Sequence, residues 1–157
     1  MTTQDDDDKQ LLQQRSFRTT RTLPFSPAQV YAAFESPEQL ARWWGPEGFS
    51  NRFEAFDFRP GGRWVFDMIG PDGKDYRNEN LFVELVPSRR IVIRHDCAPY
   101  FTLTVSLDPA GDGAAHTRLD WEQVFDDAAT AQAVRHIVEP ANEQNIDRLE
   151  RVLAAPN

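Results

Sequence analysis

The sequence predicts an α+β domain with one strand, two short helices, about six further strands and a long C-terminal helix. The strand-like runs between residues 49 and 125 are separated by short turn segments rich in Pro, Gly and Asp. Such short connections favour antiparallel neighbours, because parallel strands need long crossovers. The last segment, residues 127–155, has a helical composition and supplies the one long helix that can cover a face of this sheet.

The N-terminal part of the chain predicts a tail, a strand and two helix starts. We expect residues 1–13 to be disordered, because they show no hydrophobic period and carry the self-repelling run Asp5–Asp8. Residues 15–23 alternate loosely between polar and β-branched side chains, which favours a strand. Ser26-Pro27 then provides an N-cap and a first helical position, and Ser36-Pro37 repeats this signal. Two short helices are predicted, since a proline inside one longer helix would break it.

The central part of the chain predicts a series of strands. The expected strands are Phe49–Phe58, Gly62–Ile69, Lys74–Val86, Arg90–His95, Tyr100–Asp108 and His116–Phe125. A helix follows from Asp127 to Ala155, with apolar residues at helical spacing. Pro140 lies inside this segment, so we expect it to kink the helix or to begin its second half.

Composition excludes several classes of protein. The chain has 157 residues and a formal net charge of −8, so duplex nucleic acid and anionic membranes would repel it on average. Its apolar runs are all too short for a transmembrane helix, and its first residues are unlike a signal peptide. The single cysteine cannot form an internal disulfide. We therefore expect a cytoplasmic protein with no nucleic-acid partner and no membrane insertion.

Six motifs follow one another in a specific order along the chain. They are Ser26–Phe34, Leu40–Pro46, Asp57–Trp64, Gly70–Gly73, Phe82–Pro87 and Asn145–Leu149. Together they resemble the START-like, or SRPBCC, superfamily. More narrowly, they resemble the homologues of the activator of the ninety-kilodalton heat-shock chaperone ATPase. The resemblance covers most of the chain, from Phe17 to Leu153.

The resemblance implies a helix-grip fold, in which a curved antiparallel sheet of six to seven strands wraps around the C-terminal helix. Residues 14–157 would form this single START-like domain, with a hydrophobic cavity between sheet and helix. Members of the superfamily bind lipids, polyketides, hormones or other apolar molecules, and some are cyclases, aromatases or hydrolases. The subgroup takes its name from a co-chaperone, so a chaperone partner and a role in the stress response are further expectations.

Aromatic and aliphatic side chains repeat along one face of several predicted strands. Trp64, Phe66 and Met68 share a strand face, and Trp121 belongs to a similar stripe. Such stripes usually form packed core, but together with the resemblance they predict the wall of a ligand cavity. In the pair Trp43-Trp44 that ends the second helix, one ring is expected to plug the sheet edge or the other to guard the mouth of this cavity, and the sequence does not favour either role. The predicted ligand-binding residues are Trp44, Trp64, Phe66, Met68, Phe82, Phe101, Leu103, Trp121, Ile137 and Ala141.

Polar candidates are fewer, and none forms a known catalytic motif. Tyr76, Glu84 and His95 are the side chains able to move protons if the cavity is catalytic. Glu84 lies among apolar residues of a predicted strand, and its side chain is expected either to face solvent or to enter the cavity. His95-Asp96-Cys97 invites a nucleophile or metal interpretation, but a zinc site needs three or four ligands and no nucleophile motif is present. We predict no metal and no cofactor. Asn142 and Asn145 on the last helix are expected to supply polar contacts to a ligand.

Three functional hypotheses follow from these observations. The first is a binding protein, without catalysis, for a small apolar or aromatic ligand. The second is an enzyme of the cyclase, aromatase or hydrolase kind that uses the same cavity. The third is an interaction module that activates a chaperone ATPase. A homodimer is compatible with each of them.

Overall fold

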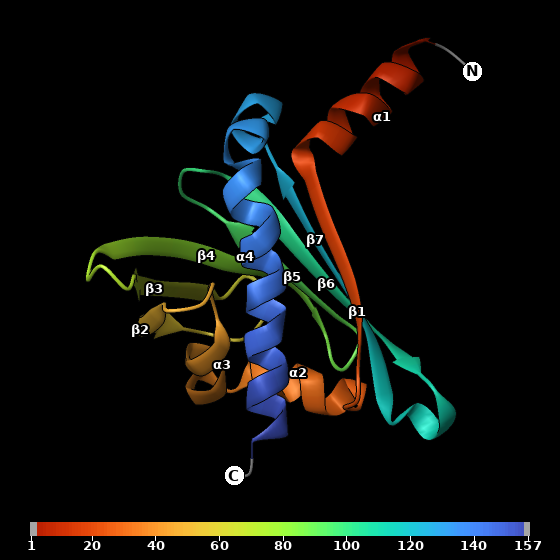
Figure 1. Cartoon of the computed structure of the whole chain (residues 1–157), viewed down its shortest axis with the longest axis vertical. Coiled ribbons are helices and arrows are strands. Elements are labelled where there is room, and N and C mark those ends of the chain that lie inside the picture. Colours follow the sequence, from red (N-terminus) through yellow and green to blue (C-terminus); the bar gives the residue numbers. More distant parts are fainter. Residues whose placement is uncertain (1–2, 156–157) are drawn as a thin grey trace.

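A computed structural model describes residues 3–155 of the chain and confirms the α+β class (Figure 1). The strands form a single seven-stranded sheet, and the long helix α4 crosses its inner face. The helices are α1 (Thr3–Arg15), α2 (Pro27–Glu35), α3 (Pro37–Trp43) and α4 (Ala128–Ala154). The strands are β1 (Ser16–Leu23), β2 (Ser50–Phe56), β3 (Arg63–Ile69), β4 (Asp75–Val86), β5 (Arg90–His95), β6 (Phe101–Ala110) and β7 (His116–Phe125).

The sheet is an antiparallel meander whose first strand returns to pair with its last. Its strand order is β1-β7-β6-β5-β4-β3-β2, and every neighbouring pair is antiparallel. The short turns predicted between consecutive strands explain this order from β2 to β7, because each strand folds back on its predecessor. Helices α2 and α3 interrupt the series after β1, which leaves β1 free to pair with β7.

A β-bulge in β4 decides which side chains of this strand face the helix. Phe82 pairs with Ile93 and Glu84 pairs with Val92, so Val83 is the extra residue. Before the bulge, Asn80 and Phe82 are buried. Regular alternation would also have turned Glu84 inward, but the extra residue reverses the order and leaves Glu84 exposed.

The helix starts follow the predicted capping signals. The Ser26 side chain accepts a hydrogen bond from the Gln29 backbone nitrogen, and the Gln29 side-chain oxygen accepts one from the Ser26 backbone nitrogen, which is a capping box. Ser36 caps α3 in a similar way. Helix α4 is continuous over 27 residues with Pro140 inside it, so no second helix begins there.

Helix α1 differs from the expectation of a disordered segment over residues 1–13. Residues 3–13 belong to a helix, and residues 1–2 lie outside the described part of the chain. The physical reason lies at the helix ends: acidic side chains in the first turn and Arg15 in the last turn complement the helix dipole. Arg15 also donates to the Phe125 carbonyl over 2.8 Å, and Gln132 donates to the Gln14 carbonyl. Helix α1 is attached at this end and projects away from the sheet (Figure 1).

The hydrophobic core lies between the sheet, α2, α3 and the C-terminal half of α4. Its largest fully buried side chains include Trp43, Trp64, Trp121, Phe34, Phe66 and Phe82. A second, smaller cluster of Phe17, Phe125 and Ala131 lies under the N-terminal half of α4. Between these two clusters the helix and the sheet do not pack tightly, and this is where the cavity described below is found. Within residues 3–155, each helix is too short or too polar to span a bilayer.

Candidate ligand-binding site

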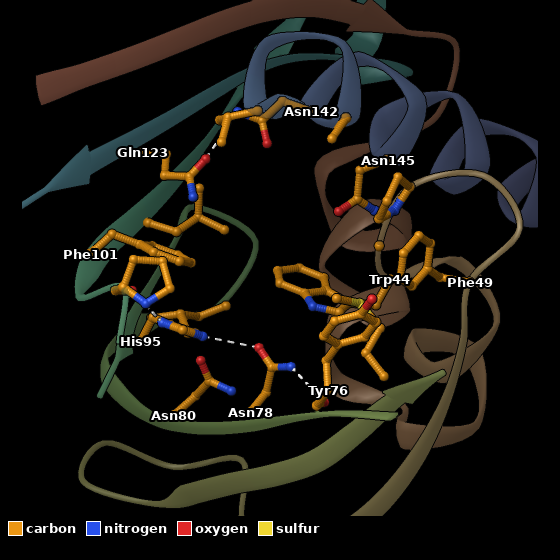
Figure 2. A pocket seen from close by; sticks show the side chains of 18 of the residues that line it. Trp44, Phe49, Tyr76, Asn78, Asn80, His95, Phe101, Gln123, Asn142 and Asn145 are labelled. Carbon is orange, nitrogen blue, oxygen red and sulfur yellow. Dashed lines mark hydrogen bonds between the residues drawn. The ribbon is translucent and has the colours of Figure 1, made fainter. Parts of the chain in front are cut away.

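A cavity of about 630 Å³ lies between the inner face of the sheet and α4 (Figure 2). Its wall is formed by residues of β3 to β7, by α4 residues from Ile137 to Asn145, and by the loop that follows α3. The volume is within the range of about 300–1,000 Å³ that is typical of sites for small molecules. The site is therefore large enough for a compact organic ligand.

Strand alternation and helix periodicity bring the wall together from distant parts of the sequence. On β4, Tyr76, Asn78 and Asn80 occupy alternate positions and all line the cavity. On α4, Ile137 and Ala141 are four residues apart and therefore share a helix face. In Figure 2, Trp44, Phe49 and Tyr76 lie on one side of the cavity, and His95, Phe101 and Gln123 lie on the opposite side.

Seven of the ten predicted ligand-binding residues line this cavity. They are Trp44, Met68, Phe101, Leu103, Trp121, Ile137 and Ala141. The other three, Trp64, Phe66 and Phe82, lie in the core beside it.

Trp64 is the central ring of this group and packs against both of the others. The Trp64 ring stacks at centroid distances of 4.7 Å on Phe66 and 5.7 Å on Phe82. Trp44 covers Trp64 edge-on at 4.9 Å, so it separates the core from the cavity. The strand pattern is the same for core and wall, which explains why the sequence did not separate the two groups.

The three candidate proton-transfer residues are divided between the two faces of the sheet. Tyr76 and His95 line the cavity. Glu84 lies on the outer face, where its side chain is 49% exposed and forms an ion pair of 3.4 Å with Arg90. It therefore cannot reach a ligand in the cavity.

His95 is buried, and both of its ring nitrogens have hydrogen-bonding neighbours. Its Nδ1 lies 2.8 Å from the Pro99 carbonyl oxygen, which can only accept, so Nδ1 carries a proton. Its Nε2 lies 3.0 Å from Asn78 Oδ1 and 3.5 Å from Cys97 Sγ, and its ring stacks on Phe101 at 4.3 Å. Burial lowers the pKa of His95 below its ordinary value of 6.5.

Arg148 of α4 holds the loop that forms one side of the cavity. Its Nη1 donates to the carbonyl oxygens of Trp44, Gly45 and Pro46 over 2.9–3.0 Å. Its Nη2 donates to the carbonyls of Arg42 and Phe49 over 2.9 and 3.0 Å. Burial lowers the pKa of this guanidinium, and the five carbonyl acceptors compensate for its lost water.

The polar groups of the wall are mainly side-chain amides, and sequence reasoning missed three of them. Asn142 and Asn145 were expected at the site, whereas Asn78, Asn80 and Gln123 were not. The available signal was the alternation Tyr76-Asn78-Asn80, which places two amides on the strand face that continues into the core. No group of three or more His, Cys, Asp or Glu side chains is arranged to hold a metal ion among the residues that the structure describes.

Comparison with known families decides the relationship suggested by the motifs. The family model described as activator of Hsp90 ATPase homolog 1-like protein matches residues 24–154, which is most of the chain. The chain belongs to this family. The START-like assignment made from the sequence motifs is thus confirmed. A comparison with curated protein sequences gives no match.

Solved structures of this fold resemble the chain over nearly its whole length. A protein from Arthrobacter aurescens is 25% identical, with a TM-score of 0.83 over 92% of this chain and 89% of that one. A protein from Chromobacterium violaceum is also 25% identical, with a TM-score of 0.77 over 90% and 99% of the two chains. A Nitrosomonas europaea protein is 21% identical, with a TM-score of 0.79 over 90% and 95%. The family and fold are those of a ligand-binding or activator-type module.

Proposed function

We propose that the protein binds a small, mostly apolar molecule in the cavity between the sheet and α4. The observation that carries this proposal is the composition of the cavity wall. Rings and aliphatic side chains such as Trp44, Phe101, Leu103 and Ile137 surround a space of about 630 Å³, with a few amide groups among them. Concave, mostly apolar sites with a small number of polar groups are typical of small-molecule binding.

The energetics support binding without a covalent step. A ligand that buries about 200 Å² of apolar surface gains about 5 kcal/mol at 25 cal/mol per Å², before the losses of freedom are subtracted. The wall already provides rings that are held by other contacts, such as Phe101, which stacks on His95. A preformed wall reduces the ordering that binding requires.

The arrangement around His95 favours a binding protein over an enzyme. A covalent mechanism needs a nucleophile, a base and a group that orients the base, all directed at the substrate. His95 is near Cys97, but the cavity wall includes Ala98 and Pro99 and not the Cys97 side chain. The partner of the other ring nitrogen is the Pro99 carbonyl and not a carboxylate. Turnover of a bound ligand would contradict this part of the proposal.

The experiment that tests the proposal combines native mass spectrometry with thermal unfolding. The purified protein is examined for a bound molecule, and then unfolded with fatty acids, flavonoids and polycyclic aromatic compounds. A ligand at about 100 times its Kd should stabilise the protein by about 2.7 kcal/mol. Failure of every compound to stabilise the protein, together with activation of a chaperone ATPase, would favour the interaction module instead.

A matched pair of variants locates the binding site. Ala141→Phe adds a ring to the cavity wall and should abolish the stabilisation, because the added volume occupies the site. Ala133→Phe makes the same change at an exposed position of α4 outside the wall and should leave it intact. Equal stabilisation of both variants would place the ligand elsewhere.

A further inference from the structure

Two amide groups of the cavity have a fixed orientation. Asn80 and Asn145 are each only 6% exposed, and each uses its nitrogen for a bond within the protein. Asn80 Nδ2 donates to the Trp64 carbonyl over 3.2 Å, and Asn145 Nδ2 donates to the Trp43 carbonyl over 2.8 Å. A backbone carbonyl can only accept, so these bonds fix which end of each amide is the oxygen.

The two fixed oxygens are left for a ligand. Within residues 3–155, neither Asn80 Oδ1 nor Asn145 Oδ1 has a hydrogen-bond partner, although both residues line the cavity. The two side chains enter the cavity from different elements, Asn80 from β4 and Asn145 from α4 (Figure 2). Neither oxygen is among the fully buried atoms, so both are accessible from the cavity. A ligand that displaces water from the cavity keeps these oxygens paired only if it donates hydrogen bonds to them.

A second amide pair adds one donor and one acceptor. Asn142 Nδ2 donates to Gln123 Oε1 over 3.1 Å, which leaves Gln123 Nε2 and Asn142 Oδ1 without partners in the described part of the chain. If both amides turned over together, the pair would still present one free donor and one free acceptor. Three of the four amide oxygens, those of Asn80, Asn142 and Asn145, are therefore without a partner in the described part of the chain.

Among the residues that the structure describes, the cavity wall has no charged side chain that is free of an ion pair and could neutralise a charged ligand. The two charged residues at its wall, Asp75 and Arg77, form ion pairs with β2: Asp75 with Arg52 at 3.4 Å and Arg77 with Glu54 at 2.8 Å. Arg77 alternates with the inward Tyr76 and Asn78, so its side chain belongs to the outer face. An anion inside the cavity would face amide oxygens with no cation beside it.

We infer that the cavity selects an uncharged ligand that carries hydroxyl or N–H groups, and that it rejects a carboxylate of the same skeleton. This inference rests on the proposed function and names the ligand class for the same site. The apolar body of the ligand lies among the rings. Its donors lie against Asn80 Oδ1 and Asn145 Oδ1, and an acceptor lies against Gln123 Nε2.

Three pyrene derivatives test the inference, because they share one apolar body and differ in one substituent. Pyrenemethanol is an uncharged donor, methylpyrene has no donor, and pyrenecarboxylate is an anion at neutral pH. Their affinities are measured by energy transfer from tryptophan to pyrene at neutral pH. We expect pyrenemethanol to bind most tightly and methylpyrene about tenfold more weakly, because it leaves the acceptors unpaired. Pyrenecarboxylate should bind about 100-fold more weakly than pyrenemethanol.

Two lysine variants separate local charge from net charge. Asn142→Lys adds a cation to the cavity wall and should raise the affinity for pyrenecarboxylate at least about tenfold. Ala133→Lys adds the same charge at an exposed position of α4 outside the wall and should leave that affinity unchanged.

The possible outcomes distinguish the inference from the proposed function. If pyrenecarboxylate binds the unmodified protein as tightly as pyrenemethanol, the inference is wrong and the binding function stands. If methylpyrene equals pyrenemethanol, the fixed acceptors do not select the ligand and the inference is also wrong. Failure of all three compounds to bind would overturn the proposed function and the inference together.

Discussion

The guanidinium of Arg148 donates a hydrogen bond of 3.0 Å to the carbonyl oxygen of Trp44, which connects α4 to the loop that forms one side of the cavity. The same Trp44 oxygen also accepts a bond of 2.9 Å from Asn51 on β2. The position of the Trp44 ring therefore depends on a helix and a strand that are far apart in the sequence. This connection explains how a loop can provide a defined part of the cavity wall.

We predict that Arg148→Met destabilises the protein by about 3 kcal/mol, because five carbonyl oxygens lose their donor at a partly buried position. The free energy of unfolding in urea measures this loss. Arg151→Met is the matched control, since Arg151 is 62% exposed and makes a surface ion pair with Glu47. Its loss should be below about 1 kcal/mol. Equal losses for the two variants would contradict the role given to Arg148.

A pair of tryptophan variants should separate the cavity wall from the core. Trp64→Leu is expected to reduce the free energy of unfolding by about 3 kcal/mol, because Trp64 is fully buried among other rings. Trp44→Leu should reduce it by only about 1–2 kcal/mol. Trp44→Leu should nevertheless weaken pyrenemethanol binding more than Trp64→Leu does, since only Trp44 of the two lines the cavity. The reverse order of binding losses would contradict the assignment of the wall.

The lowered pKa of His95 predicts a specific dependence of stability on pH. The unfolded chain binds a proton at His95 near pH 6.5, whereas the folded protein binds it only at lower pH. Stability from this residue is therefore complete above pH 6.5 and falls as the pH decreases below that value. A hydrogen bond from Arg94 lowers the pKa of Asp126, and one from Thr130 lowers the pKa of Asp127. The stability that these two carboxylates contribute is lost only below about pH 3.8, so it does not affect the range in which His95 titrates.

Urea unfolding in steps between about pH 5 and 8 measures this dependence. His95→Gln should flatten the decrease, because the variant has no titrating group at this position. His136→Gln, at an exposed position of α4, serves as the control and should keep the slope of the unmodified protein. If His95→Gln shows the same decrease in the free energy of unfolding with falling pH as the unmodified protein, another group causes the decrease.

The outer position of Glu84 predicts that it has no part in ligand binding. Glu84→Gln should leave the affinity for pyrenemethanol unchanged and alter the free energy of unfolding by less than about 1 kcal/mol. Fluorescence titration and urea unfolding of this variant measure both quantities. A tenfold loss of affinity would mean that the strand presents Glu84 to the cavity.

Much of the fold could be predicted because its signals are local. Pro27 and Pro37 begin helices, and the strand Arg90–His95 has the predicted bounds, since turn residues on either side determine where it starts and stops. The order of the strands could also be predicted, because short turns permit few arrangements.

The site could be predicted only in part, because its composition depends on contacts that the sequence does not encode locally. The bulge at Val83 reverses the alternation of β4, and nothing in the local pattern marks it. The separation of Trp64 from Trp121 as core and wall depends on how α3 and Trp44 cover one end of the sheet. The five carbonyl partners of Arg148 likewise exist only after the chain has folded.

The most direct test of the central claim is a nuclear magnetic resonance titration of the isotope-labelled protein with pyrenemethanol. The binding account predicts saturable shifts of the side-chain amide signals of Asn80, Gln123 and Asn145 and of the Trp44 indole N–H. Exposed residues on the outer face of the sheet, such as Val83 and Val86, should keep their signals. Shifts confined to the outer face, or an absence of saturable shifts, would contradict the claim that this cavity binds the ligand.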